Sequence, residues 1–279
     1  MITNLTSTSA MMSPDQIAQY KKDAETTHYK SDFNFLNTHN GWRIGKIHLI
    51  VAPTHAGKST LTRSMIWDFV INNPDSVVYL WLSEESKEDF LQELSKVGLQ
   101  QEQLYRIHVF SEQDRDMSIS ERKLFFAETL NTISPSIVFF DNVTTSEFYM
   151  DRKIEEQSSF AKYLKRKANE ELIPIVVIAH TGGDSGLMNR LLELNMIRGG
   201  KSIVNLTEFA YILQRFKVTN PNTGKDEYFP TIRLEKHRGF VCEDTMFKLR
   251  FNNRTVTFME DRAINWEEFK DAFKKQLTL

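Results

Sequence analysis

Hydrophobic residues in the first two-thirds of the chain form short unbroken runs, separated by longer amphipathic stretches. Runs without polar alternation are typical of strands buried on both faces, and amphipathic stretches between them predict crossover helices. This alternation over residues 41–180 predicts a parallel sheet covered by helices on both faces. The expected strands are 46–51, 77–82, 106–110, 136–140 and 175–179, and the expected helices are 58–71, 86–97, 120–133 and 151–172.

The pattern differs at the two ends of the chain. After residue 200 it predicts two hairpins, which turn at 220–224 and 252–253. Residues 1–12 lack periodicity and are expected to fray, whereas 13–40 should contain a helix over 14–28 and the segment leading into the first strand. The apolar stripe of that helix is narrow, which fits an arm leaning on another subunit and equally fits a solvated helix. A short helix is expected within 261–279, after a main domain over 41–260.

Composition narrows the class of protein. The 279 residues include 35 Lys and Arg against 37 Asp and Glu, a net charge of −2 that excludes binding nucleic acid as a bulk polycation. The single cysteine, Cys242, excludes an internal disulfide framework and a zinc site built from cysteines. No apolar run approaches the roughly 18 residues of a membrane span, and the N-terminus lacks the pattern of a signal peptide. We therefore expect a cytoplasmic globular protein with no membrane partner.

The strongest chemical signal is the run 52–60, which fits the phosphate-binding pattern G-x-x-x-x-G-K-[ST] with alanine in place of the first glycine. It lies between a predicted strand and a predicted helix, where backbone N–H groups can surround a polyphosphate. Lys58 is expected to reach the β- and γ-phosphates, and the Ser59 hydroxyl to bind Mg²⁺. The sequence therefore predicts ATP and Mg²⁺ as cofactors, with nucleotide contacts from Ala52, Pro53, Thr54, His55, Ala56, Gly57, Lys58, Ser59 and Thr60.

Three later strand ends carry polar residues that should meet at the same edge of the sheet. Asp141 ends an apolar strand, as does the Walker B acid that holds Mg²⁺ in nucleotide hydrolases. Glu84 follows the second strand and is our first choice for the residue that orients the attacking water. Glu85 is the runner-up, although either acid could simply stabilise a helix N-terminus. His180 ends the strand 175–179 and could sense the γ-phosphate, although a lone histidine is more often structural.

Together these motifs resemble the RecA-like motor domain of DnaB-type and RepA-like hexameric replicative helicases, of phage or plasmid type. The resemblance covers about residues 30–260 and includes 41–46, 196–203 and 235–239, which are similar to the family's glycine-rich lead-in, Arg-Gly-Ser and Gly-Lys-x-Arg-Asn-Gly segments. It implies an ATP hydrolase that forms a homo-oligomeric ring, expected to be a hexamer, and translocates on single-stranded DNA during replication. The fold it implies is α/β, a RecA-like parallel β-sheet sandwiched by helices with C-terminal β-hairpins and an N-terminal linker helix.

The resemblance also assigns residues outside the phosphate loop. Lys236 and Arg238 are two apart on a predicted strand and therefore point the same way, toward the γ-phosphate of a neighbouring subunit. The alternative is a pair of surface cations on an edge strand. Two loops, 144–153 and 182–201, are expected to face the central channel of the ring, and the first would present Phe148 and Tyr149 there. Their proposed DNA-binding residues are Arg152, Lys153, Arg190, Arg198 and Lys201.

Two departures from the family pattern bear on function. His180 is closer to the RepA-like branch than to the DnaB branch, which usually has glutamine there. A large primase-binding domain is not expected in 279 residues, so primase is in doubt as a partner, although other replication proteins stay possible. The alternatives are a RecA/RadA-like recombination ATPase, a DNA-dependent ring ATPase that loads or regulates replication proteins without unwinding, and a small-molecule kinase. The kinase is disfavoured because an arginine-rich lid is missing.

Overall fold

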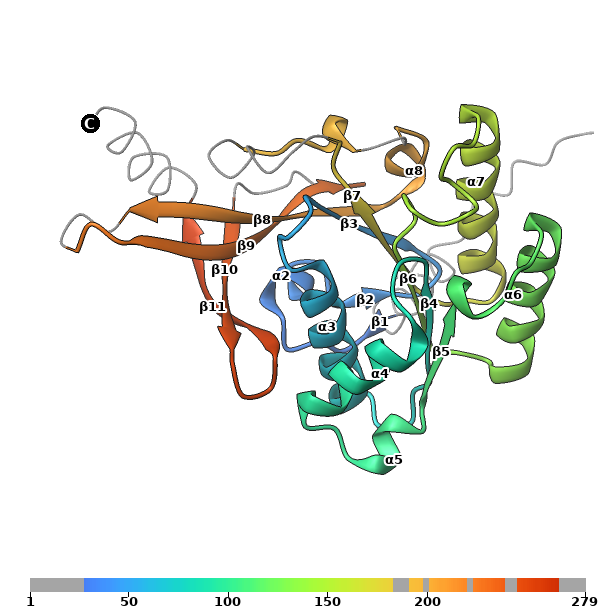
Figure 1. Cartoon of the computed structure of the whole chain (residues 1–279), viewed down its shortest axis with the longest axis horizontal. Coiled ribbons are helices and arrows are strands. Elements are labelled where there is room, and N and C mark those ends of the chain that lie inside the picture. Colours follow the sequence, from blue (N-terminus) through green and yellow to red (C-terminus); the bar gives the residue numbers. More distant parts are fainter. Residues whose placement is uncertain (1–27, 183–190, 198–200, 220–222, 239–244, 266–279) are drawn as a thin grey trace, which may run out of the picture.

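A computed structural model describes residues 28–182, 191–197, 201–219, 223–238 and 245–265. Its main feature is a nine-stranded sheet with the order β11-β10-β9-β8-β3-β7-β6-β4-β5, and β1 and β2 form a separate two-stranded sheet (Figure 1). The strands are β1 (His28–Tyr29), β2 (Trp42–Arg43), β3 (Ile47–Ala52), β4 (Val78–Leu82), β5 (Ile107–Ser111), β6 (Ile137–Asp141), β7 (Ile175–His180), β8 (Phe209–Thr219), β9 (Asp226–His237), β10 (Thr245–Asn252) and β11 (Thr257–Asn265).

The helices connect the parallel strands. They are α2 (Asn34–Asn37), α3 (Lys58–Asn72), α4 (Lys87–Leu94), α5 (Gln101–Leu104), α6 (Ile119–Ile133), α7 (Ile154–Glu170) and α8 (Lys201–Leu206), with short 3₁₀ turns at Ser95–Val97, Glu112–Asp114 and Leu194–Met196.

Six neighbouring strands, from β8 through β3, β7, β6 and β4 to β5, run parallel, and β9 to β11 continue the sheet in antiparallel fashion. The α/β class and the parallel sheet predicted from the sequence are therefore confirmed. The two predicted hairpins are also present, as β8–β9 and β10–β11. Strand β11 continues to Asn265, five residues beyond the domain boundary expected at 260, so residues 261–265 belong to the sheet. The rest of 261–279, where a short helix is expected, lies outside the described residues.

The two faces of the sheet carry separate hydrophobic cores. Alternate residues of each parallel strand point to opposite faces, so Ile50 packs on the side of α3 and α4, whereas Leu49 packs on the side of α6 and α7. Figure 1 shows these helix pairs on opposite sides of the sheet. Because both faces are covered, the central parallel strands consist almost entirely of apolar residues, and this explains the unbroken runs in the sequence.

Local signals fix several helix ends. Ser118 caps α6 in a capping box with Glu121, and the Ser86 hydroxyl accepts a hydrogen bond from the Asp89 amide at the start of α4. The helical stretch after Ser86 ends at Gly98, whose φ of 85° suits glycine. The helix expected over 151–172 is shorter, since α7 begins only at Ile154. The expected helix over 14–28 lies outside the described residues except for His28, which is in strand β1.

Candidate functional site

The predicted phosphate loop connects the carboxyl end of β3 to the first turn of α3. Its backbone takes left-handed conformations at His55 (φ 63°) and Gly57 (φ 97°), and Gly57 is the N-cap of α3. A Cβ atom at Gly57 would lie 2.8 Å from the ring of Phe258, which comes from strand β11. Both the positive φ and this close approach require glycine, so the loop has the tight form that exposes backbone N–H groups at a helix N-terminus.

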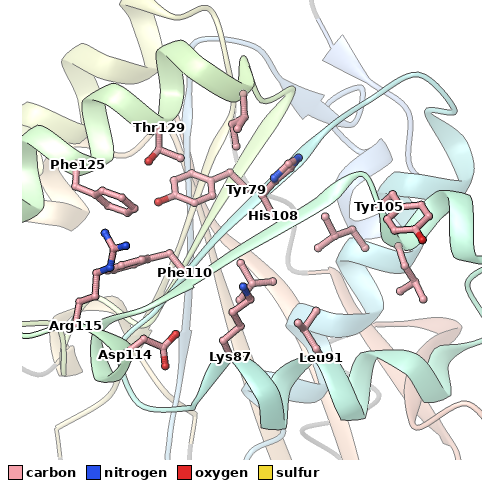
Figure 2. A pocket seen from close by; sticks show the side chains of 14 residues that line it. Tyr79, Lys87, Leu91, Tyr105, His108, Phe110, Asp114, Arg115, Phe125 and Thr129 are labelled. Atoms are coloured by element: carbon pink, nitrogen blue, oxygen red, sulfur yellow. The ribbon is translucent and has the colours of Figure 1, made fainter.

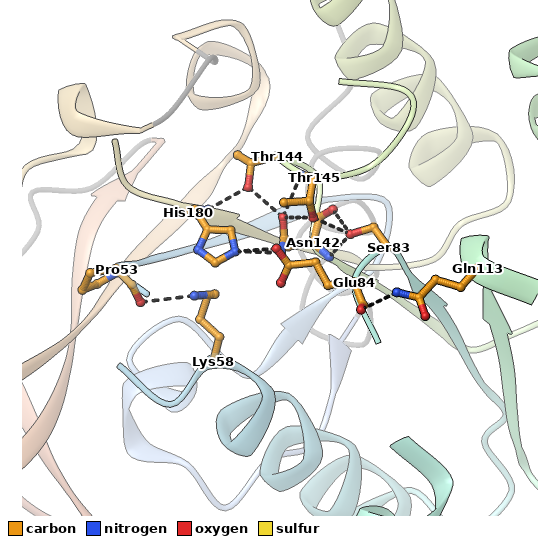
Figure 3. A network of polar contacts seen from close by, with 9 residues as sticks. All are labelled: Pro53, Lys58, Ser83, Glu84, Gln113, Asn142, Thr144, Thr145 and His180. Carbon is orange, nitrogen blue, oxygen red and sulfur yellow. Dashed lines mark hydrogen bonds and ion pairs between the residues drawn. The ribbon is translucent and has the colours of Figure 1, made fainter. Parts of the chain in front are cut away.

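Lys58 lies across this loop. Its Nζ atom donates a hydrogen bond to the carbonyl oxygen of Pro53 at 3.1 Å (Figure 3). Burial lowers the pKa of the Lys58 ammonium, and the carboxylates of Asp141 and Glu84 act in the opposite direction. The Lys58 ammonium therefore interacts with two acids that come from the ends of different strands.

Asp141 ends β6, two strands away from the phosphate loop in the sheet order. Its carboxylate accepts a hydrogen bond from the Thr62 hydroxyl at 2.8 Å, which ties it to the second turn of α3. Burial raises the pKa of Asp141, and the Thr62 hydrogen bond and the Lys58 charge oppose that shift. The described residues contain no cluster of three or more potential metal ligands. Mg²⁺ typically needs only one or two carboxylates when phosphate oxygens and water complete its shell, and Asp141 is one carboxylate at this edge of the sheet.

Glu84 and His180 meet at this edge, although they are 96 residues apart. His180 Nε2 lies 3.1 Å from Glu84 Oε1 and 2.9 Å from Asn142 Nδ2 (Figure 3). The hydrogen bond from His180 is the main cause that lowers the pKa of Glu84 to about 2. The Glu84 side chain is still 48% exposed, so the carboxylate is held in its ionised form and remains accessible to water.

Asn142 fixes the orientation of this pair. Its Oδ1 atom accepts hydrogen bonds from the Thr144 hydroxyl (2.7 Å) and from the Thr145 amide (3.0 Å) and hydroxyl (2.9 Å). The amide nitrogen must therefore face His180 and Glu84, and it acts there as a donor. When His180 Nε2 carries the proton that Glu84 accepts, Asn142 Nδ2 donates to the same carboxylate. The 2.9 Å approach of Nδ2 to Nε2 then brings two donors side by side on one acceptor and is not itself a hydrogen bond.

Ser83 joins the ends of β4 and β6 behind Glu84. The Ser83 hydroxyl donates to the main-chain carbonyl oxygen of Asn142 at 2.8 Å and accepts from the main-chain N–H of Asn142 at 3.0 Å. It also lies 2.7 Å from the Thr145 hydroxyl. Our sequence interpretation missed Ser83, Asn142 and Thr62. The only signal for them is their position next to predicted strand ends or in the first turns of the helix after the loop.

Glu85, the runner-up, has different surroundings. Burial raises its pKa, and the positive charge of Arg63 opposes this shift. No hydrogen bond joins the Glu85 carboxylate to the other predicted site residues in the described part of the chain. The geometry thus favours Glu84 as the carboxylate that faces the phosphate loop.

Lys236 and Arg238 lie at the edge of the sheet where β3 begins, opposite to the edge that carries the phosphate loop. Lys236 pairs with Ala210, and His237 pairs with Phe209, which in turn lies beside His48 at the start of β3. Lys236 donates to the Val204 carbonyl oxygen and Arg238 to that of Asn205, both near the C-terminal end of α8. Neither cation approaches the phosphate loop of its own chain, because that loop follows the opposite end of β3.

The aromatic residues of the loop 144–153 do not lie where we expected them. Phe148 and Tyr149 were expected to face a channel, but they are buried in the core under α7, with 3% and 2% of their surfaces exposed. Arg152 is partly exposed and donates to the Glu147 carbonyl oxygen at 3.0 Å, whereas Lys153 is exposed at the start of α7. Arg190 and Arg198 lie outside the described residues, and Lys201 is the first residue of α8.

A cavity of about 630 Å³ lies away from these residues (Figure 2). It borders the edge strand β5 and is lined by side chains from α4, α6 and the segments around β5, including Tyr79, Tyr105, Phe110, Arg115 and Phe125. It contains none of the predicted site residues and is therefore separate from the phosphate loop.

No known protein-family model matches the chain, and a comparison with curated proteins gave no match. Within the described ranges, no helix combines the length and the apolar character needed to cross a membrane.

Proposed function

We propose that the protein is a RecA-like ATP hydrolase that works as a ring and translocates on single-stranded DNA. The observation that carries the proposal is the convergence of Lys58, Asp141, Glu84 and His180, from four separate segments, on one edge of a parallel sheet. The carboxyl edge of such a sheet is the usual place for a ligand. A phosphate loop with an acid at a neighbouring strand end matches the requirements of Mg²⁺-dependent phosphoryl transfer.

The roles of the residues follow from their chemistry. Lys58 and the loop amides bind the β- and γ-phosphates, and Ser59 and Asp141 hold Mg²⁺, which neutralises charge on the phosphate oxygens. Glu84 is ionised and accessible, so it can accept a hydrogen bond from a water molecule and orient that water toward the γ-phosphate. His180 holds the Glu84 carboxylate and can exchange that partner for an anionic phosphate oxygen.

The ring is supported by the position of the cation pair. Lys236 and Arg238 extend from the end of the sheet opposite to the phosphate loop, so in a single chain they cannot contact the γ-phosphate. A neighbouring copy placed around a ring could receive them at its own nucleotide. Their present acceptors are main-chain carbonyl oxygens, which a phosphate oxygen can replace with a gain in charge complementarity.

Contacts to DNA are proposed for the basic residues of the two loops, Arg152, Lys153, Arg190, Arg198 and Lys201. Few cations per subunit are enough, because several subunits of a ring contact the phosphates of one strand together. We infer backbone contacts in place of base stacking at the first loop, since Phe148 and Tyr149 are buried.

The same residues are compatible with a second candidate function, a DNA-dependent ring ATPase that loads or regulates replication proteins without unwinding. A fork-unwinding assay with ATP, combined with native mass measurement of the assembly, tests both candidates. Unwinding by a closed oligomer supports the helicase, and DNA-stimulated hydrolysis by a ring that does not unwind supports the second candidate. A monomer with no DNA-dependent activity would contradict both.

A further inference from the structure

Ser111, Glu112 and Gln113, at the end of β5, contact both the main chain around Glu84 and the loop 144–153. On one side, the Ser111 hydroxyl donates to the Glu85 carbonyl oxygen at 2.8 Å, and Gln113 Nε2 donates to the Glu84 carbonyl oxygen at 2.6 Å. Figure 3 shows Gln113 reaching the Glu84 backbone from outside the cluster around His180. The main chain that carries Glu84 is thus held from the neighbouring strand.

On the other side, Glu112 holds the loop. Its carboxylate accepts hydrogen bonds from Trp81 Nε1 (2.7 Å), the Ser146 hydroxyl (2.6 Å) and the Glu147 amide (3.0 Å). Glu112 is only 8% exposed, and within the described ranges it forms no ion pair. A buried carboxylate is costly without such donors, so the two hydrogen bonds from Ser146 and Glu147 restrain the loop, while the bond from Trp81 fixes the carboxylate to β4.

Glu147, one of the two loop residues bonded to Glu112, also contacts Arg152, which is proposed to contact DNA. The Glu147 carbonyl oxygen accepts a hydrogen bond from Arg152 Nε at 3.0 Å, and the Arg152 guanidinium lies 3.8 Å from the Glu147 carboxylate. A continuous series of contacts therefore runs from Arg152 through Glu147 and Glu112 to Gln113 and the Glu84 backbone. Two of these links join different segments, the bonds from the loop to Glu112 and the bond from Gln113 to the Glu84 backbone, so a shift of the loop must change either these bonds or the position of Glu84.

We propose that Glu112 and Gln113 are positioning residues that couple occupancy of the loop 144–153 by a nucleic acid strand to the placement of the Glu84 carboxylate. Arg152 leaves the Glu147 carbonyl oxygen when it binds a phosphate of the strand. The loop then moves relative to Glu112, and Gln113 transmits that movement to the main chain at Glu84. This coupling rests on the proposed function, because it requires Glu84 to act in ATP hydrolysis.

Gln113→Ala tests the coupling with little risk to the fold, because the Gln113 side chain is exposed. We expect the ratio of DNA-stimulated to basal kcat to fall about two- to tenfold, the range that one hydrogen bond supplies, with the KM for ATP unchanged. The matched control is Gln101→Ala, which removes another exposed glutamine whose amide donates one hydrogen bond, to the Tyr105 hydroxyl. A ratio unchanged in Gln113→Ala, or reduced equally in Gln101→Ala, would overturn the coupling.

A second measurement does not depend on DNA or on turnover. Hydrogen exchange of residues 144–153 is compared with and without a non-hydrolysable ATP analogue and Mg²⁺. We expect the analogue to change exchange at Ser146 and Glu147 in the wild type and in Gln101→Ala, and not in Gln113→Ala or Glu112→Gln. An equal response in all four proteins, or no response in a wild type that binds the analogue, overturns the coupling alone. A wild type that binds no analogue overturns the proposed function and the coupling with it.

Discussion

His180 Nε2 lies 3.1 Å from Oε1 of Glu84, and this contact holds the Glu84 carboxylate at the edge of the sheet where the phosphate loop ends. The two residues come from β7 and from the segment after β4, strands that β6 separates in the sheet. Asn142, which follows β6, lies between them and donates to the same carboxylate. The contact between His180 and Glu84 therefore forms because β7, β6 and β4 are neighbours in the sheet and end at the same edge.

Replacement of His180 tests the role of this contact. In His180→Ala, Glu84 loses the main cause of its low pKa, which should rise from about 2 toward its ordinary value of 4.5. The kcat for ATP should fall about 10- to 100-fold, because the carboxylate loses its orientation, while nucleotide binding persists. Steady-state kinetics and nucleotide titration measure both. The exposed His108 provides the control, and equal effects of His108→Ala and His180→Ala would contradict the role.

Lys58→Ala should abolish ATP hydrolysis. The substitution removes a cation that interacts with the carboxylates of both Asp141 and Glu84, and we expect a loss of at least about 100-fold in kcat/KM. The measurement is phosphate release at saturating Mg²⁺. Lys87→Ala, at an exposed position in α4, serves as control, and Lys58→Ala protein that turns over ATP at the wild-type rate would refute the assignment of the loop.

Gly57→Ala and Gly98→Ala separate backbone strain from close contact. Both glycines have a positive φ (97° and 85°), so alanine costs about 1 kcal/mol at either site. Only at Gly57 does a new Cβ meet another group, the Phe258 ring. We expect Gly57→Ala to lose more stability in urea unfolding and also to weaken nucleotide binding, with part of the loss restored by Phe258→Leu. Equal destabilisation of the two variants would argue against this packing.

If Lys236 and Arg238 act on the nucleotide of a neighbouring subunit, a variant subunit should also impair the wild-type subunits in a mixed ring. Arg238→Ala subunits added to wild-type subunits should reduce ATP hydrolysis by more than their own fraction, because each variant subunit impairs its neighbour's site. The control is Arg254→Ala, at an exposed position in the β10–β11 turn. A loss in proportion to the fraction of variant subunits would show that Arg238 does not act on a neighbouring subunit.

The buried histidines His39 and His48 predict that the stability of the protein depends on pH. Burial lowers the pKa of His39 to about 3, with His237 and Arg43 adding to the effect, and lowers that of the fully buried His48 well below 6.5. The unfolded chain therefore binds more protons below pH 6.5, and stability falls as the pH drops from 6.5 toward 3. For His39 the loss is about 2 kcal/mol between pH 6.5 and 5.

Urea unfolding at pH 7 and pH 5 measures this dependence. His39→Gln should reduce the difference between the two pH values by about 2 kcal/mol, since glutamine does not titrate and can still bond the Tyr211 hydroxyl that His39 contacts. His108→Gln is the control, because His108 is exposed. A pH dependence that is the same in His39→Gln and in the wild type would contradict the effect of burial.

The strands and the main site residues could be predicted because each depends on local sequence. An apolar run such as 175–179 identifies a buried strand, and the polar residue that follows it must lie at the carboxyl edge. The roles of Glu112 and Phe258 could not be predicted, because they depend on which strands are neighbours and on how the β10–β11 hairpin packs against α3. Phe148 and Tyr149 were misinterpreted, since a segment that contains three serines or threonines and a glutamate gives no sign that its aromatic residues turn inward.

The most direct test of the proposed function is steady-state ATP hydrolysis with and without single-stranded DNA, in the wild type and in Glu84→Gln. We expect turnover by the wild type to rise when DNA is added, and turnover by Glu84→Gln to be low in both conditions although it still binds ATP. Turnover that does not respond to DNA, or a Glu84→Gln variant as active as the wild type, would contradict the proposal.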